Sequence, residues 1–283
     1  MPSTTIAQAL AQAQAAGLAR IDAQMLLLHV LDRPSHDRAW LLMHDGDAMD
    51  EGALARWHAL CARRAGGEPV AYLTGRKEFF GLPLQVDARV LDPRPDTETL
   101  VEWALELLAP CPAPRVADLG TGSGAIALAI QQQRPDARVL AVDASAGALA
   151  VARANALRLG LPVQCVQGDW LAGLAGPFDA IVSNPPYIPA ADPHLAALTH
   201  EPLSALASGA DGLQDIRNII AQAPATLAPG GWLLLEHGWD QAQAVQALLR
   251  AAGFDQVQSR MDLAGIARCS GGSMPVGLSP TVK

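Results

Sequence analysis

Hydrophobic residues recur at helical spacing through the first quarter of the chain. The segments 6–16, 22–31 and 50–67 place apolar residues three and four positions apart, and each is followed by a glycine or a proline that would end a helix. We therefore expect a small helical bundle over residues 1–67 that forms a separate N-terminal domain.

The pattern changes between residues 68 and 95, where aromatic and β-branched residues alternate with glycines and prolines. Such a stretch is typical of a hairpin, here one that links two domains. Helical spacing returns in the segment 96–109. Asp96 is expected to cap this helix, with Thr97 in its first turn.

Short apolar runs alternate with helical segments from residue 115 onward. The strands predicted from these runs are 115–120, 138–143, 163–169, 178–184, 231–238 and 254–260. This alternation predicts an α/β domain over residues 96–270, with a largely parallel sheet covered by helices on both faces. Ligands of such sheets bind beyond the carboxyl ends of the strands. Residues 271–283, rich in Gly, Pro and Ser, are predicted to be a disordered tail.

Composition narrows the class of protein. Half of the residues are hydrophobic and 17% are charged, as in a globular protein. The formal charge of −8 argues against an extended nucleic-acid-binding surface, which needs clustered Lys and Arg, and leaves a local basic patch open. No direct nucleic-acid contact is expected. No signal peptide or apolar run long enough for a membrane span is evident, so a cytoplasmic location is expected. The protein is also expected to be a monomer. The cysteines and histidines lack metal-ligand spacing, and no metal site is predicted.

A glycine-rich turn follows the first strand of the α/β region. It comprises Gly120, Thr121, Gly122, Ser123 and Gly124. Glycines let the backbone turn tightly and approach a ligand at the start of the next helix. Asp143, after the second strand, is placed to accept both ribose hydroxyls of a nucleoside. Trp170, after the third strand, can pack on its base, although a tryptophan here is about as often a core aromatic. NAD and S-adenosylmethionine (AdoMet) both fit this pattern, and glycines needed only for packing would also explain the turn.

A rigid polar turn ends the fourth strand and distinguishes these cofactors. It consists of Asn184, Pro185, Pro186 and Tyr187. Proline has no N–H, so the turn presents carbonyl acceptors beside the Asn184 side-chain oxygen, an arrangement suited to an –NH₂ group. Binding both protons of that group would align its nitrogen for methyl transfer, and Tyr187 can pack on the planar group. AdoMet therefore fits better than NAD, although a purely structural Asn-Pro turn is the alternative.

Over residues 5–268 the sequence resembles the AdoMet-dependent protein-glutamine N-methyltransferases, and among them the release factor glutamine methyltransferases. The matching motifs are "GEPVAYLTGRKEFFGLPL", "PRPDTETLVE", "DLGTGSGAIAL", "VSNPPYIP", "HEPLSAL", "LLLEHGW" and "DLAGIAR". The resemblance implies a Rossmann-like class I methyltransferase domain with a mostly parallel seven-stranded sheet. It also implies methylation of the glutamine in the Gly-Gly-Gln motif of peptide chain release factors, with the N-terminal helices gripping that partner. Gly120 to Gly124, Asp143, Trp170 and Asn184 would contact AdoMet, and Asn184 to Tyr187 would hold the glutamine.

Two stretches differ from the family pattern. Asp92 stands where an apolar residue usually precedes Pro-Arg-Pro, and residues 192–201 lack the Arg-Phe that usually precedes Glu-Pro. Leu91 is a candidate for the wall of the glutamine pocket, although leucines are more often core residues. The alternatives that remain are glutamine methylation of a ribosomal protein, adenine N6 methylation of nucleic acid, and a non-catalytic AdoMet sensor.

Overall fold

The computed structural model describes residues 4–277. The chain forms two compact units, and the boundary between them along the sequence lies between Arg76 and Lys77. The helical unit thus extends past residue 67, where the sequence predicted its end. The difference comes from a short additional helix, α5 (Val70–Thr74), in the segment expected to be a hairpin.

Local sequence explains why α5 forms. Pro69 precedes it with a fixed φ suited to a helix start, and the Thr74 hydroxyl donates to the Val70 carbonyl oxygen at 2.9 Å. Gly75 ends the helix in the left-handed conformation at φ +67°. The predicted hairpin follows, shorter than expected, as β1 (Arg76–Phe79) and β2 (Leu82–Gln85).

The helical unit is held by one hydrophobic cluster that includes Leu26, Leu27 and Trp57. Thr5 begins its first helix with a capping box that pairs it with Gln8. The helices before α5 are α1 (Ile6–Ala15), α2 (Arg20–Val30), α3 (Arg38–Met43) and α4 (Glu51–Ala65).

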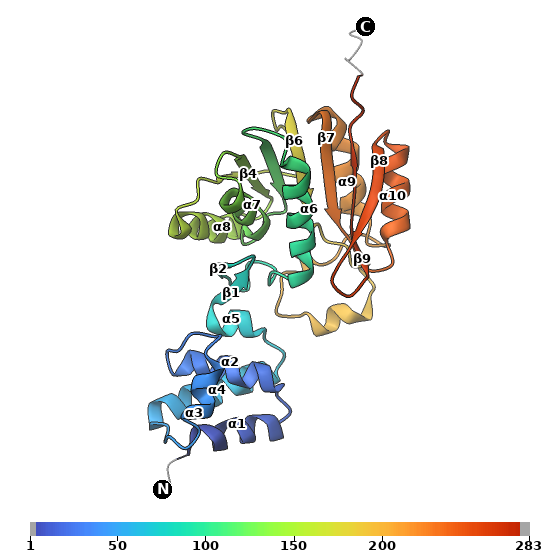
Figure 1. The fold of residues 1–283 in the computed structure, drawn as a ribbon. Coiled ribbons are helices and arrows are strands. Elements are labelled where there is room, and N and C mark those ends of the chain that lie inside the picture. Colours follow the sequence, from blue (N-terminus) through green and yellow to red (C-terminus); the bar gives the residue numbers. More distant parts are fainter. Residues whose placement is uncertain (1–3, 278–283) are drawn as a thin grey trace. The chain divides into compact units, whose positions relative to one another are not determined.

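The second unit is built on a seven-stranded sheet, as the family resemblance implied (Figure 1). Its order is β5-β4-β3-β6-β7-β9-β8, and β9 runs antiparallel to both of its neighbours. The strands are β3 (Arg115–Leu119), β4 (Arg138–Asp143), β5 (Gln164–Gln167), β6 (Phe178–Ser183), β7 (Leu227–Glu236), β8 (Asp255–Met261) and β9 (Ala267–Ser273).

Helices pack on this sheet through apolar residues. Alternate positions of the central strands, such as Leu119, Ile181 and Leu233, share a buried cluster with Ile216 and Val245 of the helices. The helices are α6 (Glu98–Leu108), α7 (Ala125–Gln133), α8 (Ala146–Leu159), α9 (Gln214–Gln222) and α10 (Ala242–Ala251). The 3₁₀ turns are η1 (Pro95–Thr97), η2 (Pro193–Ala197), η3 (Leu203–Ala205) and η4 (Ala223–Ala225). Within residues 4–277, no helix is both long and apolar enough to cross a membrane.

The prediction of a disordered tail from residue 271 is wrong for residues 271–273. They form the end of β9 and are buried against β7. A Cβ on Gly271 would lie 2.5 Å from the Leu234 side chain and 2.6 Å from the Leu233 oxygen, so the small residues permit close packing. The composition that indicated disorder therefore reflects a tight strand contact. Residues 278–283 of the predicted tail lie outside the described residues.

Candidate active site

A cavity of about 350 Å³ opens at the carboxyl ends of the central strands of the second unit. The four strands β5, β4, β3 and β6 are adjacent and parallel, so the turns that follow them meet at one edge of the sheet. The predicted site residues in its wall are Gly120, Thr121, Gly122, Ser123, Asp143, Trp170, Asn184 and Pro186. Gly124, Pro185 and Tyr187 are not part of that wall. Leu91, a candidate for the pocket wall, is.

The glycine turn needs glycine for two separate reasons. Gly120 and Gly122 have φ values of +67° and +56°, in the left-handed region that favours glycine. A Cβ on Gly120 would also lie 3.3 Å from the Trp170 ring. Gly124 serves packing rather than the cavity, because a Cβ there would lie 3.0 Å from the Leu128 side chain.

Asp143 links this turn to the next strand. Its carboxylate accepts from the Gly122 N–H at 2.9 Å through one oxygen and from the Ser145 N–H at 2.8 Å through the other. Each carboxylate oxygen has a second lone pair, so two acceptor positions are left for hydroxyl groups in the cavity. A 1,2-diol such as that of a ribose matches this pair of acceptors.

Asp118, the last but one residue of β3, supports the glycine turn and was not among the predicted site residues. It is fully buried, and its Oδ2 accepts from the Thr121 hydroxyl at 2.6 Å and the Ala127 N–H at 3.1 Å. Its Oδ1 has no hydrogen-bond partner in the described part of the chain. Burial raises the pKa of Asp118 to about 7. Its contacts hold the glycine turn and the start of α7 together.

The turn after β6 places Asn184 in the cavity wall. The Asn184 Nδ2 donates to the Thr97 Oγ1 at 3.2 Å. Tyr187 is held through its backbone, since its carbonyl oxygen accepts from the Gln241 Nε2 at 3.0 Å. Burial is the main cause of a raised pKa for the Tyr187 phenol, so this side chain stays neutral. The turn is therefore fixed on both sides of its two prolines.

Thr97 lies in a 3₁₀ turn, η1, just before α6, and its side chain contacts Asn184 from there. This start of the helix differs from the prediction. Asp96 was expected to cap the helix, but no side-chain cap bond is present, and η1 precedes α6 instead. Asp96 forms an ion pair with Arg268 at 3.4 Å. Thr97 is buried, with 4% of its surface exposed, and its hydroxyl oxygen faces Asn184.

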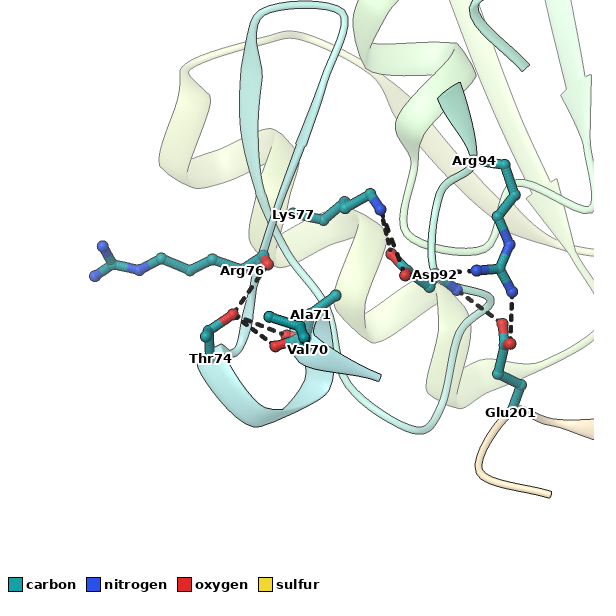
Figure 2. A network of polar contacts seen from close by, with 8 residues as sticks. All are labelled: Val70, Ala71, Thr74, Arg76, Lys77, Asp92, Arg94 and Glu201. Atoms are coloured by element: carbon teal, nitrogen blue, oxygen red, sulfur yellow. Dashed lines mark hydrogen bonds and ion pairs between the residues drawn. The ribbon is translucent and has the colours of Figure 1, made fainter. Parts of the chain in front are cut away.

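An ion-pair network lies beside the cavity and joins residues 77, 92, 94 and 201 (Figure 2). Arg94 and Pro202 both line the cavity. The Arg94 guanidinium contacts Glu201 at 2.5 Å and Asp92 at 3.6 Å, and the Asp92 N–H donates to Glu201 at 3.3 Å. Lys77 reaches Asp92 at 3.2 Å. The charge at position 92, unusual for the family pattern, is thus matched by two cations.

No three His, Cys, Asp or Glu side chains within residues 4–277 are arranged as ligands for a metal ion. Thr97, Arg94, Asp118 and Glu201 were not among the predicted site residues. Only the motif "PRPDTE" signalled the first two, and it gave no indication of what they contact. Asp118 and Glu201 lie in the motifs "DLGTGSGAIAL" and "HEPLSAL", which likewise gave no indication of their contacts.

Comparisons with known proteins agree with this architecture. The chain matches the family descriptions "PrmC N-terminal domain" over residues 4–75 and "Methyltransferase small domain" over residues 97–259. The release factor glutamine methyltransferase of Bordetella pertussis is 54% identical over 260 residues, covering 90% of this chain and 95% of that protein. The corresponding protein of Escherichia coli is 43% identical over 259 residues, covering 90% and 92%.

Solved structures show the same fold at low sequence identity. A methyltransferase from Pyrococcus furiosus has a TM-score of 0.54 at 19% identity, covering 80% of this chain and 100% of that one. The 16S rRNA N2 G1207 methyltransferase of Thermus thermophilus, solved with AdoMet and guanosine, also has a TM-score of 0.54 at 19% identity, covering 70% and 49%. The second unit therefore has the class I methyltransferase fold.

Proposed function

Because the chain belongs to the release factor glutamine methyltransferase family, we propose that it methylates the side-chain amide nitrogen of a glutamine in peptide chain release factors. The methyl donor is AdoMet, the cofactor of this family. The observation that carries the proposal is the position of Asn184 and Pro186 in the wall of the same cavity as the glycine turn and Asp143.

The residues of the cavity fit AdoMet. The two free acceptor positions of Asp143 suit the ribose hydroxyls. The close backbone approach at Gly120 to Ser123 suits the amino-acid portion, and Trp170 provides an apolar face for the adenine. Bound there, AdoMet supplies an electrophilic methyl group on a sulfonium.

The Asn-Pro-Pro-Tyr turn is assigned the acceptor side. An amide nitrogen is a poor nucleophile because its lone pair is delocalised into the carbonyl. The Asn184 oxygen and a backbone carbonyl of the turn can accept its two N–H bonds, which orients the nitrogen and stabilises the positive charge it gains. Tyr187, which lies outside the cavity wall, supports the turn from its far end. The N–CH₃ bond would form as the S–CH₃ bond of AdoMet breaks, and the nitrogen would then release one proton to water.

The finer assignments belong to the same proposal. The acceptor is the glutamine of the Gly-Gly-Gln motif, and the helical unit, which matches its own family description over residues 4–75, grips the body of the release factor. The protein acts as a cytoplasmic monomer, without direct contact to nucleic acid.

Labelled AdoMet, the purified protein and a release factor test this function directly. We expect one labelled methyl group on the release factor and none on a variant whose Gly-Gly-Gln glutamine is replaced by Glu. A lysate that lacks the enzyme serves as a second substrate pool. Label found on a ribosomal protein or on nucleic acid instead would identify the wrong acceptor class.

Asp143→Ala is expected to weaken AdoMet binding by about 2 kcal/mol, the scale of hydrogen bonds to a charged group. Asp143→Asn, which keeps one acceptor oxygen, should lose less. Titration calorimetry on the free protein measures both, with NAD as a ligand that we expect not to bind. Unchanged AdoMet affinity in Asp143→Ala would remove this residue from the ribose.

A further inference from the structure

The Asn184 carboxamide has a problem of orientation. Only its oxygen can accept an N–H bond from an acceptor amide, yet the oxygen and nitrogen ends have nearly the same size and shape. A rotated carboxamide would present two donors to a group that is itself a donor. Some neighbour must therefore select the rotamer with the oxygen toward the cavity.

Two buried residues lie beside Asn184: Thr97, which also lines the cavity, and Glu236. Ser183 of β6 pairs with Leu235 of β7, so Asn184 and Glu236 occupy adjacent positions at the ends of neighbouring strands. Thr97 precedes α6 and contacts both of them, through its oxygen to the Asn184 Nδ2 at 3.2 Å and through a side-chain hydrogen bond to Glu236. Thr97 and Glu236 are 4% and 1% exposed.

We infer that Thr97 and Glu236 are positioning residues that hold the Asn184 carboxamide with its oxygen toward the acceptor glutamine. A hydroxyl has one proton, and an ionised carboxylate can only accept. The Thr97 proton therefore goes to Glu236, which leaves only lone pairs of the Thr97 oxygen for Asn184. Asn184 must then present its –NH₂ end to Thr97, and its oxygen is left for the acceptor. This inference rests on the proposed function, since it concerns the same acceptor.

Glu236 is a buried carboxyl group whose surroundings disfavour its charge, which agrees with a positioning role. Its Oε2 has no hydrogen-bond partner in the described part of the chain, which is costly for a buried carboxyl. Burial raises the pKa of Glu236 to about 7, although the hydrogen bond from Thr97 and the charge of Arg268 both lower it. Asp96 adds to the rise, and the Tyr187 hydroxyl, which also bonds to Glu236, opposes it. The Cys269 thiol faces the same carboxyl, and burial keeps this thiol neutral by raising its pKa.

We call the hydrogen-bonded chain from Glu236 through Thr97 to Asn184 the relay. Thr97→Val tests it through activity, since valine keeps the shape of the side chain and removes the hydroxyl. We expect single-turnover methylation of a release factor to slow by about 10- to 100-fold, the effect of a misplaced orienting group. AdoMet affinity should change much less than the rate, because valine keeps the volume of this side chain in the cavity wall. Thr97→Ser, which keeps the hydroxyl, should restore most of the rate. Thr226→Val is the matched control, because Thr226 is another buried threonine whose hydroxyl donates to a backbone oxygen, that of Ala223.

The activity result separates the inference from the function it rests on. A wild-type protein that methylates no release factor would refute the proposed function. A wild-type protein that is active, together with a Thr97→Val variant that is folded and equally fast, would refute the relay alone. A serine variant as slow as the valine variant would also refute it, because the hydroxyl would then not be the active feature.

A second measurement needs neither substrate nor turnover, and it decides the matter if Thr97→Val does not fold. The side-chain amide signal of Asn184 in a ¹⁵N-labelled sample, identified by its loss in Asn184→Ala, should shift as Glu236 titrates near pH 7. The shift should disappear in Glu236→Gln. A signal that does not move with pH in the wild type, or a titration that persists in Glu236→Gln, would contradict the inference.

Discussion

Asn184→Asp is expected to abolish methyl transfer while the protein stays folded and continues to bind AdoMet. The change is nearly isosteric, and a carboxylate still accepts hydrogen bonds, so the loss of an acceptor is not the reason. A negative charge at this position would pair with the positive charge of the bound donor before transfer. That charge disperses as the methyl group moves, and an interaction that is stronger before the transition state than within it slows the reaction.

The relay behind Asn184 increases this effect. A carboxylate at position 184 would compete with Glu236 for the single proton of Thr97. If Glu236 lost that proton, the Tyr187 hydroxyl would be its remaining neutral partner. A buried carboxyl group at Glu236 and a partly buried one at position 184 would repel each other across one hydroxyl and favour a rearranged site. The defect should therefore exceed that of simple truncation.

Asn184→Ala provides the comparison. It removes the orienting acceptor without adding charge, and it should cost about 10²-fold, by analogy with the removal of one transition-state hydrogen bond. Single-turnover methylation of a release factor measures both variants, with calorimetry for AdoMet binding and thermal unfolding for the fold. Near-normal rates in Asn184→Asp at unchanged stability would mean that the turn is structural and the catalytic assignment wrong.

Much of the fold could be predicted because its signals are local. Strands of the parallel sheet are short apolar runs, and the helices between them keep a regular spacing, so the α/β alternation from residue 115 can be recognised without any tertiary information. The errors arose where composition was ambiguous. Gly271 to Ser273 have the composition of a tail but pack tightly on β7, and α5 lies within a stretch rich in β-branched residues.

The central site residues could be predicted for the same reason. Gly120, Asp143 and Asn184 each follow a strand directly, and the ends of adjacent parallel strands meet at one edge. The motif could not show which members face the cavity. Within Asn-Pro-Pro-Tyr, Asn184 and Pro186 line it while Pro185 and Tyr187 do not, because successive residues of the turn point in different directions.

The supporting residues could not be predicted, because their contacts join distant parts of the sequence. Thr97 lies 87 positions before Asn184, and Arg94 lies 107 positions before Glu201. A threonine before a helix or a glutamate at a strand end has no local signature of such a contact. Only the packing of β6 beside β7 brings Glu236 next to Asn184.

Arg94→Leu is expected to free the segment around η2 and η3 from the mouth of the cavity. The Glu201 side chain is 3% exposed, and without Arg94 it would face Asp92, another carboxylate, with only a backbone N–H as partner. Breaking a buried ion pair from one side is strongly destabilising. Removing one partner of a buried ion pair costs about 3 to 5 kcal/mol in unfolding free energy. Because Arg94 itself is 38% exposed, we expect a loss at the low end, about 3 kcal/mol.

The structure also provides the controls for this variant. Arg94→Leu combined with Glu201→Gln removes the unpaired charge and should recover a large part of the lost stability. Arg217→Leu breaks a more exposed pair with Asp211 and should have little effect on stability, because water screens this pair. Urea unfolding gives the global free energy, and amide hydrogen exchange over residues 193–205 gives the local one. If the effect is local, exchange there rises by about 100-fold while the rest of the sheet stays protected.

Pro202, Ser204 and Ala205 line the cavity, so the KM for the release factor should rise as well in Arg94→Leu. Unchanged exchange over residues 193–205 in Arg94→Leu would show that the segment is held by its backbone and apolar contacts, and that the network only neutralises charge.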